Sequence, residues 1–466
     1  MEKRNHNDIS LTNELEDKII KEKNEISYEK RLKIYDINQK NFKIFKDTIH
    51  GNIEFSKHFL EIIDHPYFQR LRNLKQLGLT NFVYNNANHT RFEHSLGTGY
   101  LCIKYLELLK KRNQYIELSE EEISLIGIAG LSHDLGHGPY SHTFEKWIHK
   151  EMKNSNWHHE NFSCELIEKI INQRNIDIDT SQVNFIKNLI CGNHKKDEER
   201  MFLYEIVSNS ETSIDVDKFD YLERDAFHTG FKINFDSNRI MNVSRIIDGK
   251  IAFHRGDAFN LYNLYSNRYL LHSQVYNHKT TIAIELMFYD ILSNSEPILK
   301  ISERPVETLG DEIIYEIQNS KEFGLEKAQK LIKDIYSRNL YKKVCEFLLP
   351  NNIDKKEFLT KLTVENIANE SVELTPNDFR IFSYDINHAL KDKNPLSFIP
   401  FFDDWNSNNW FTLKNDEISY FLPIQFIETH FRIYIIDKTK ENRAKSAIYR
   451  FSKQYNFNFI FNNINL

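Results

Sequence analysis

The sequence predicts a mainly α-helical protein with a smaller, mixed α+β lobe at its C-terminal end. Apolar residues recur at helical spacing through most of residues 62–295. After about residue 300 the pattern changes, and short β-rich runs such as residues 431–437 alternate with helices expected at 325–348 and 443–454. At 466 residues the chain is too long for one ordinary core, so we expect two or three lobes, with a boundary near residue 300.

Composition and charge limit the class of protein. Lys and Arg number 61 against 67 Asp and Glu, and the net charge of −6 argues against a wholly basic nucleic-acid coat without excluding local basic sites. The first 40 residues are rich in Glu, Lys, Asn and Asp, which predicts a charged, flexible N-terminal tail. No apolar run approaches the ~18 residues of a membrane span. We therefore expect a soluble protein of the cytoplasm or nucleus, with no membrane partner.

The four cysteines are dispersed along the chain and include no CxxC pair. This pattern suits a reducing compartment, and we expect each thiol to be a buried apolar group. They are Cys102, Cys164, Cys191 and Cys345.

Ordered structure should begin near Phe42, where an alternating pattern favours a short strand or turn. Pro66 suits the first turn of a helix expected over residues 62–77. Thr90 can cap a long helix on which Arg91 and His94, three residues apart, share a face.

Two further helices flank residues 131–142, a stretch that carries three histidines. Ser119 with Glu122 makes a capping box that opens a helix ending at His133. Residues 157–175 predict another amphipathic helix, with His158 and His159 at its entrance. His133 therefore stands at the end of one helix, and the His158–His159 pair stands at the start of the other.

Residues 131–142, LSHDLGHGPYSH, hold the densest group of candidate metal ligands. His133 offers an imidazole nitrogen and Asp134 a carboxylate oxygen at the end of a buried helix. Two glycines and a proline then turn the chain off the helix axis, so that His137 and His142 can point back toward the same place.

A metal site needs further ligands from other rigid elements, and two candidates stand elsewhere in the chain. His94 lies on an earlier helix, and Asp217 follows Asp215 in a stretch that also holds the apolar residues Ile214 and Val216. Two imidazoles with two carboxylates match the open sites in which a divalent ion keeps water. The alternative is that each histidine is a buried or capping residue and that the carboxylates of residues 201–225 are solvated helix faces.

A metal site of this kind activates water toward phosphorus or carbonyl centres, and other side chains would then serve the reaction. His137, His142 and His159 are candidate proton donors for a leaving alkoxide. Candidate phosphate-binding cations are Arg91, Lys218 and Arg268, each of which has a solvated surface cation as its alternative.

His94, the His133–Asp134 pair and Asp217 are similar to the H…HD…D pattern of the HD phosphohydrolase superfamily. One branch is resembled more closely, the deoxynucleoside triphosphate triphosphohydrolases of the eukaryotic SAM-and-HD-domain type. The resemblance covers about residues 42–345 and is carried by the strings DTIHGNIEF, DHPYFQRLRNLKQLG, RFEHSLGTGYL, GLSHDLGHGPYSH, FLYEIVSN, IDVDKFDYLERD and YNHK.

The resemblance implies a domain organisation. An HD-domain helical core would span residues 41–300, and residues 301–466 would form a lobe that contributes to oligomer and allosteric sites. Residues 1–40 leave no room for an N-terminal SAM domain.

The resemblance also implies hydrolysis of a dNTP to the deoxynucleoside and intact inorganic triphosphate. His94, His133, Asp134 and Asp217 would hold iron, zinc or manganese, with Mg²⁺ accompanying the nucleotides. His159 would be the general acid, with His137 and Asp134 also in the catalytic group. Phosphate-binding positions are Arg91, His137, His142, Lys218, Tyr221 and Arg268; sugar-binding positions are Gln76 and Asp225; and Leu77 and Tyr276 would exclude a 2′-hydroxyl.

Members of the resembled branch are allosteric, which implies GTP or dGTP as activator and a homotetramer that is a dimer without nucleotide. Asp64, Gln69 and Arg72 match the guanine-reading trio, and Asp and Arg suit the donor and acceptor edges of guanine. The other matching nucleotide-binding positions are Lys43, Arg239, Asn260, His278, Lys279, Arg338 and Lys342.

Two rival functions stay open at this point. One is an HD phosphohydrolase acting on another nucleotide, as a phosphodiesterase or nucleotidase, which would not release triphosphate from dGTP. The other is a non-enzymatic HD protein that binds single-stranded nucleic acid weakly and in a salt-dependent way.

Overall fold

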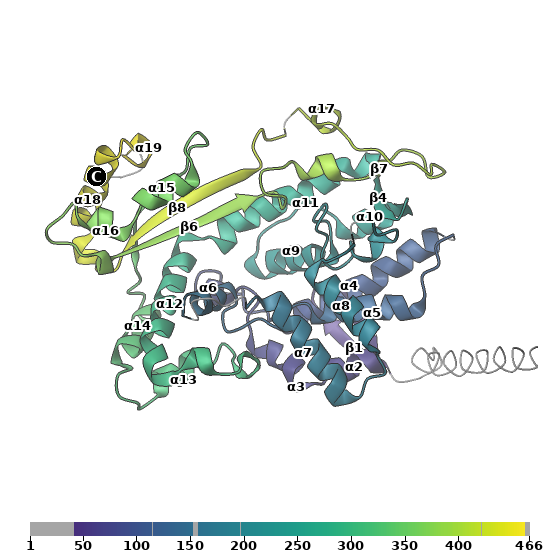
Figure 1. Ribbon diagram of the computed structural model, residues 1–466, viewed down its shortest axis with the longest axis horizontal. Coiled ribbons are helices and arrows are strands. Elements are labelled where there is room, and N and C mark those ends of the chain that lie inside the picture. Colours follow the sequence, from purple (N-terminus) through teal and green to yellow (C-terminus); the bar gives the residue numbers. More distant parts are fainter. Residues whose placement is uncertain (1–41, 114, 152–156, 196, 421, 462–466) are drawn as a thin grey trace, which may run out of the picture.

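The computed structural model describes residues 42–113, 115–151, 157–195, 197–420 and 422–461. The tail expected over residues 1–40 lies outside these ranges. Helices dominate the described part, and three small sheets accompany them. In Figure 1 the helices of the first half of the chain gather on one side, and the long strands β6 (Phe379–Asn387) and β8 (Ile427–Ile435) run along the opposite edge. The expected fold class, mainly α with a mixed C-terminal part, is confirmed.

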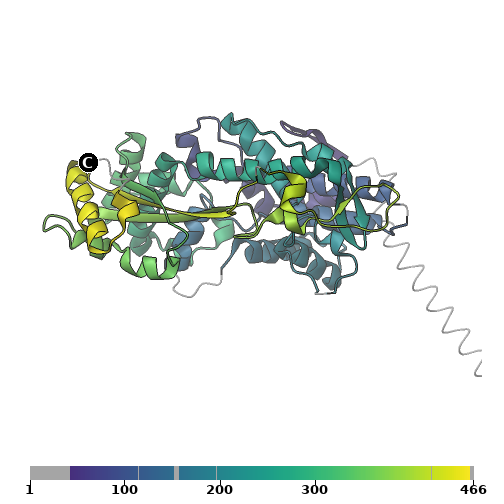
Figure 2. The same cartoon turned by 90° about the horizontal axis from the view of Figure 1, so that it is seen from above.

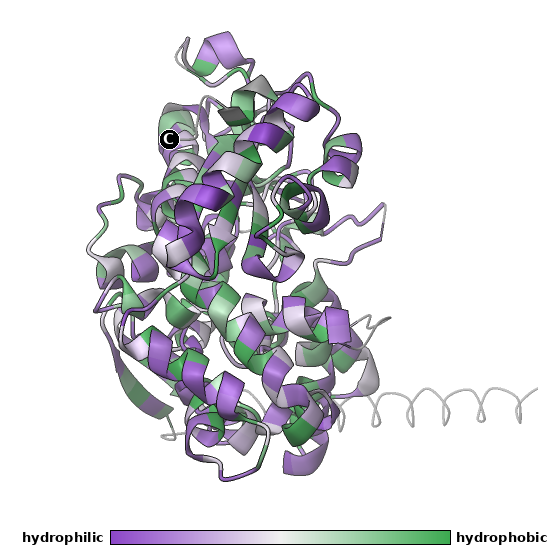
Figure 3. Cartoon of the chain, turned by 90° about the vertical axis from the view of Figure 1, so that its left-hand side faces the viewer, coloured by the Kyte–Doolittle hydropathy of each residue, from purple (hydrophilic) through white to green (hydrophobic). Residues whose placement is uncertain are grey.

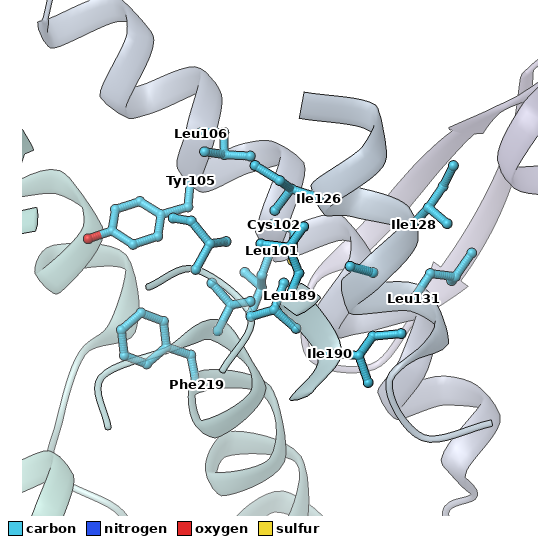
Figure 4. Close-up of a cluster of buried hydrophobic side chains, with 14 of the residues drawn as sticks. Leu101, Cys102, Tyr105, Leu106, Ile126, Ile128, Leu131, Leu189, Ile190 and Phe219 are labelled. Carbon is cyan, nitrogen blue, oxygen red and sulfur yellow. The ribbon is translucent and has the colours of Figure 1, made fainter. Parts of the chain in front are cut away.

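Four helices form the centre of the main core: α4 (Arg91–Arg112), α5 (Glu120–Ser132), α8 (Thr180–Cys191) and α9 (Val216–Thr229). Figure 4 shows side chains from all four converging, among them Tyr105, Ile126, Leu189 and Phe219, which are buried. Full burial of such a side chain is worth about 1.5–3 kcal/mol. The packing therefore fixes the relative positions of the helices that carry His94, His133 and Asp217.

The helix caps read from the sequence are confirmed. Thr90 and Glu93 form a capping box at the start of α4, and Ser119 and Glu122 form one at the start of α5. Pro66 occupies the first turn of α3 (Pro66–Gln69). The continuous helix expected over 62–77 is wrong, because α2 (Lys57–Ile63) ends before Pro66 and a 3-10 turn over Arg70–Asn73 follows α3.

Short sheets surround the helical core. Strands β1 (Phe42–Asp47) and β2 (Gly51–Ser56) form an antiparallel hairpin, as the alternation near Phe42 predicts. A second sheet has the order β3 (Ser244–Ile247), β4 (Lys250–His254), β7 (Phe401–Phe402). In the third, β8 lies between β5 (Lys342–Leu348) and β6. Figure 2 shows β6 and β8 extended along the molecule, beside the C-terminal helices.

The C-terminal part departs from the sequence prediction in two places and agrees with it at one helix. The helix expected over 325–348 ends with α14 (Glu326–Tyr336), and β5 follows it. The helix expected over 443–454 is α18 (Glu441–Gln454). Phe457 and Ile460 are buried in a local core, so this part of the expected loose tail is packed. Residues near Phe401 return to the main core, and the boundary near residue 300 stays a prediction.

The other helices of the described part follow, and Figure 3 shows hydrophilic and hydrophobic residues interleaved along the helices on the side that faces the viewer. The other helices are α6 (His142–Glu151), α7 (His159–Arg174), α10 (Ser237–Asn242), α11 (Ala258–Leu271), α12 (Lys279–Leu299), α13 (Ile313–Asn319), α15 (Lys355–Lys361), α16 (Val364–Ala368), α17 (Asn415–Ile418) and α19 (Asn458–Phe461). Within the described ranges, none of the helices is both long and apolar enough to cross a membrane.

The cysteines are partly as expected. Cys102, Cys164 and Cys345 are buried, but Cys191 is only half-buried. Cys164 on α7 and Cys191 at the end of α8 come together, with their sulfurs 3.5 Å apart.

Candidate metal centre and active site

The four side chains predicted as metal ligands converge on one point. Nε2 of His94 lies 3.1 Å from Oδ1 of Asp217, 3.2 Å from Nε2 of His133 and 3.7 Å from Oδ2 of Asp134. Nε2 of His133 lies 3.4 Å from Asp217 and 3.5 Å from Asp134. Metal bonds of 2.0–2.2 Å place neighbouring tetrahedral ligand atoms about 3.3–3.6 Å apart. The separations among His94, His133 and Asp217 match a coordination shell, and Asp134 lies beside them with a different oxygen toward each histidine.

The two histidines present the correct nitrogen to such an ion. His133 donates from Nδ1 to the carbonyl of Gly130 over 2.7 Å, and His94 donates from Nδ1 to Asp220 over 2.7 Å. Each ring in its neutral form therefore carries its proton on Nδ1, so that Nε2 is the nitrogen that a metal would bind. Hydrogen bonds of this kind fix the tautomer and ring orientation of metal-binding histidines.

Asp220 belongs to a buried charge network that sequence reasoning did not identify. Its two oxygens accept 2.8 Å hydrogen bonds from Arg224, one oxygen also bonds His50 at 2.7 Å, and Arg224 reaches Asp47 at 2.9 Å. Asp220 and Arg224 lie one turn apart on α9, whereas His50 and Asp47 come from the β1–β2 hairpin. The i, i+4 spacing of Asp220 and Arg224 was the available signal, but it is also the pattern of an ordinary exposed pair.

Gly97 makes room for this network. It lies on α4 one turn after His94, and a Cβ added to it would lie 1.9 Å from Oδ1 of Asp220 and 2.6 Å from the guanidinium of Arg224. Only a residue without a side chain allows α9 to approach α4 this closely.

The electrostatics of the centre favour positive charge between the rings. Burial alone lowers the pKa of His94, but hydrogen bonds to Asp217 and Asp220 outweigh it and raise that pKa to about 10. Burial would raise the pKa of Asp217, whereas hydrogen bonds with His133 and His94 hold it below its usual range. Because the donors are two imidazoles and two carboxylates in a field that attracts cations, they fit a divalent metal.

Asp134 joins the centre to the predicted phosphate-binding residues. Its carboxylate pairs with the buried guanidinium of Arg91, which also donates to Oγ of Ser141, and Oδ1 of Asp134 lies 3.2 Å from Nε2 of His137. The field of Arg91 and the neighbouring histidines holds the pKa of Asp134 well below its usual value, although burial opposes this.

His159, the predicted general acid, is held by a carboxylate that the sequence did not single out. Its ring stacks on that of His137 with 3.9 Å between centroids, and its Nδ1 lies 3.1 Å from Oε2 of Glu145. His142 lies nearby, with its side chain 70% exposed. Burial acts to raise the pKa of Glu145, but hydrogen bonds from His142 and His159 keep it below its usual range.

The residues predicted to surround the deoxyribose differ in how they are hydrogen-bonded and buried. Tyr276 donates its hydroxyl to Oδ2 of Asp225 over 2.6 Å, and His89 bonds Oδ1 at 2.7 Å. The side-chain carbonyl of Gln76 is buried and has no hydrogen-bond partner among the described residues. Leu77 is half-buried against the main core. A buried polar atom without a partner is costly, so the Gln76 carbonyl has an acceptor position left to fill.

The other predicted phosphate contacts differ in how far they are already paired. Lys218 lies 2.8 Å from Asp215, which also caps α9. Arg268 donates to the carbonyl of Asn387, but its Nε is buried without a partner among the described residues. Burial raises the pKa of Tyr221, with the charge of Arg268 acting against this. Of the two cations, Lys218 is already paired with a carboxylate, whereas Arg268 keeps one unpaired N–H group.

The predicted guanine-reading residues lie together on the surface around α3. Lys43 is 3.9 Å from Asp64, Arg72 donates to Gln69 over 2.9 Å, and Gln69 donates to the carbonyl of Ile63.

The other predicted nucleotide contacts are spread over separate elements. Arg239 pairs with Asp257, Asn260 bonds the backbone of Asp236, and His278 caps α12 just before Lys279. Arg338 donates to the carbonyl of Phe82, and Lys342 is 4.0 Å from Glu441.

Comparison with known proteins identifies the same family as the sequence motifs. The HD domain family profile matches residues 91–225, which include all four converging ligands. The chain is 39% identical over 424 residues to the deoxynucleoside triphosphate triphosphohydrolase SAMHD1 homolog of Dictyostelium discoideum, covering 90% of this chain and 82% of that protein. It is 32% identical to Homo sapiens SAMHD1 (93% and 76% covered) and 33% identical to the putative HD domain-containing protein L394 of Acanthamoeba polyphaga mimivirus (88% and 95%). The chain belongs to the SAMHD1 family of deoxynucleoside triphosphate triphosphohydrolases.

Proposed function

We propose that this protein hydrolyses deoxynucleoside triphosphates to deoxynucleoside and inorganic triphosphate, in a metal-dependent reaction. The observation that carries the proposal is the convergence of His94, His133, Asp134 and Asp217 beside the His159–Glu145 pair. The SAMHD1 proteins that share 30–39% identity with this chain are named for this activity. Iron, zinc or manganese is the proposed metal, with Mg²⁺ accompanying the nucleotides.

When bound, the divalent cation supplies Lewis-acid stabilisation of the charge that develops at the attacked phosphate. Release of intact triphosphate requires attack of water at the α-phosphorus and departure of the sugar 5′-oxygen, which then needs a proton. His159 suits that task, because Glu145 holds its Nδ1 and leaves Nε2 to face the substrate. Proton transfer of this kind contributes typically 10²–10⁴-fold to rate.

The proposed positioning of the triphosphate rests on cations and histidines around the centre. Arg91 and His137 both contact Asp134, so groups that bind phosphate also hold a metal ligand. Lys218, Tyr221 and Arg268 complete the polar lining, and the unpaired Nε of Arg268 offers a donor. His142 is exposed enough to contact the outer phosphates.

Preference for deoxyribose is proposed to come from shape. The carbonyl of Gln76 can accept the 3′-hydroxyl proton, and the hydrogen bond between Asp225 and Tyr276 holds the Tyr276 ring in place. A ribose 2′-hydroxyl pressed against Leu77 and Tyr276 would lose its water partner, at a cost of about 1–3 kcal/mol.

We further propose activation by GTP or dGTP and assembly from a dimer to a homotetramer. The support is the surface cluster of Lys43, Asp64, Gln69 and Arg72, whose acidic and basic groups suit the edges of guanine. The remaining predicted contacts would be contributed across subunit interfaces. Size-exclusion chromatography with and without GTP, on the wild type and Arg72→Ala, tests this; a variant that still assembles with GTP would contradict it.

The decisive test is incubation of the protein with each dNTP and Mn²⁺ or Mg²⁺, with and without GTP, followed by chromatography of products. Deoxynucleoside and intact triphosphate are expected, and His133→Ala or Asp134→Ala should abolish their release while the chain stays helical. Deoxynucleoside monophosphate or free phosphate as the product would instead identify a phosphodiesterase or nucleotidase. Salt-dependent binding of single strands without turnover would identify a nucleic-acid-binding protein.

A further inference from the structure

A second group of potential metal ligands lies on the outer side of the His159–Glu145 pair. Glu145 and His149 are four residues apart on α6 and so share one helix face. His158 caps the N-terminus of α7 and brings its ring to the same place. None of these three side chains belongs to the His94–Asp217 centre.

The side chains of this group are close enough to share one ion, and one pair already has the spacing of metal ligands. One ligand atom from each of Glu145, His149 and His158 lies within 4.8 Å of the others. Oε1 of Glu145 is 3.3 Å from Nδ1 of His158, which equals the ~3.3 Å between neighbouring ligands of tetrahedral zinc. The two histidine rings lie edge to face, 5.1 Å between centroids.

His149 shows the same second-layer arrangement as the ligands of the main centre. Its Nε2 donates to the carbonyl of Trp157, so its proton sits on Nε2 and the lone pair of Nδ1 is available. At His133 a backbone carbonyl fixes the tautomer in the same manner. Such a carbonyl contact is the usual outer partner of a metal-binding histidine.

We propose that Glu145, His149 and His158 form a second binding site for a divalent metal of the zinc type. One carboxylate and two imidazoles are a ligand set that zinc accepts, and three protein ligands leave a further position open. The group is open to solvent on one side, because the side chain of His158 is 53% exposed. The site is reachable from outside and separate from the HD centre.

Occupancy of this site would affect the reaction through Glu145. One oxygen of its carboxylate faces His158, and the other bonds Nδ1 of His159 at 3.1 Å. A cation on the first oxygen draws charge from the carboxylate that supports His159. Inhibition by excess zinc therefore follows, and this consequence rests on the proposed function.

The binding itself is tested without turnover. The full chain is stripped of metal with a chelator and dialysed against Co²⁺, and bound equivalents are measured by elemental analysis together with visible absorption. Two equivalents are expected for the wild type and for the control His194→Gln, and one for the double variant His149→Gln/His158→Gln. A double variant that binds as many equivalents as the wild type, or a wild type that binds one, overturns the proposal.

Measurements of triphosphate release distinguish failure of the second metal site from failure of the proposed function. Zn²⁺ added beyond one equivalent should inhibit triphosphate release by the wild type and by His194→Gln, but not by the double variant. Failure of the proposed function would remove triphosphate release from all of them alike, while the difference in Co²⁺ equivalents would persist. Equal inhibition of all three proteins would overturn the regulatory consequence of the second site.

Discussion

Asp220→Asn is the substitution that tests most directly how the HD centre is supported. Asp220 is buried, accepts Nδ1–H of His94, and carries the negative charge opposite Arg224. Asparagine has nearly the same shape, but its amide can donate to Nδ1. The neutral ring of His94 would then favour the tautomer with its proton on Nε2, the nitrogen that faces Asp217, and would bind a metal less tightly.

The expected size of the effect has two parts. Removal of one partner from a buried ion pair costs about 3–5 kcal/mol, and the lower end applies because Arg224 keeps its 2.9 Å contact with Asp47. Loss of an outer partner of a metal ligand typically weakens metal binding 10–100-fold, about 1.4–2.8 kcal/mol. The cost of the broken ion pair is present without metal, whereas the weaker metal binding appears only when metal is added.

Urea unfolding of the chelator-treated protein measures the first part, and competition with a chromogenic chelator measures the second. Glu223→Gln is the matched control on α9, because burial already raises the pKa of Glu223 and so favours a neutral side chain there. An Asp220→Asn variant that binds Mn²⁺ as tightly as the wild type would refute the role given to Asp220.

Three further outcomes are expected. Gly97→Ala should destabilise the protein by about 1–3 kcal/mol through overpacking against Asp220, in place of the usual gain of about 1 kcal/mol in a helix, and so lower the melting temperature; an unchanged thermal unfolding curve would contradict this. Glu145→Gln should reduce kcat for triphosphate release about 10²-fold with little change in KM, because it removes the charge that supports His159; a change confined to KM would speak against that role. Burial raises the pKa of Glu205 to about 7, above the ~4.3 of an unfolded chain, so its contribution to stability falls as pH rises between these values. Glu205→Gln should therefore stabilise the protein by about 3 kcal/mol at pH 8 and little near pH 4, which urea unfolding at both pH values checks.

The helices of the catalytic half could be predicted because local signals agree there with tertiary packing. Thr90 with Glu93 and Ser119 with Glu122 place two helix starts correctly. The strand β5 was missed because its sequence, KKVCEFL, continues the apolar spacing of α14, and only its pairing with β8 makes it extended. Local spacing does not contain that long-range partner.

The inner ligands of the site could be predicted, whereas their supports could not. His133 and Asp134 stand side by side, and their pattern is rare enough to be recognised. Asp220, Arg224 and Glu145 look like ordinary charged residues on helices, and only the fold shows that two of them are buried. Because Asp220 and Arg224 are buried, their ion pair holds the ring of His94 in a fixed orientation.

The β1–β2 hairpin connects a predicted nucleotide contact on the surface with the hydrogen-bond network behind His94. Lys43, a predicted nucleotide contact, lies on β1 four residues before Asp47. Asp47 bonds Arg224, which bonds Asp220, which in turn orients His94. The hairpin is therefore not a mere cover on the helical core, because its position sets the geometry of a metal ligand. A ligand that shifted β1 would alter the hydrogen bond behind His94, and a contact at Lys43 is in a position to do so.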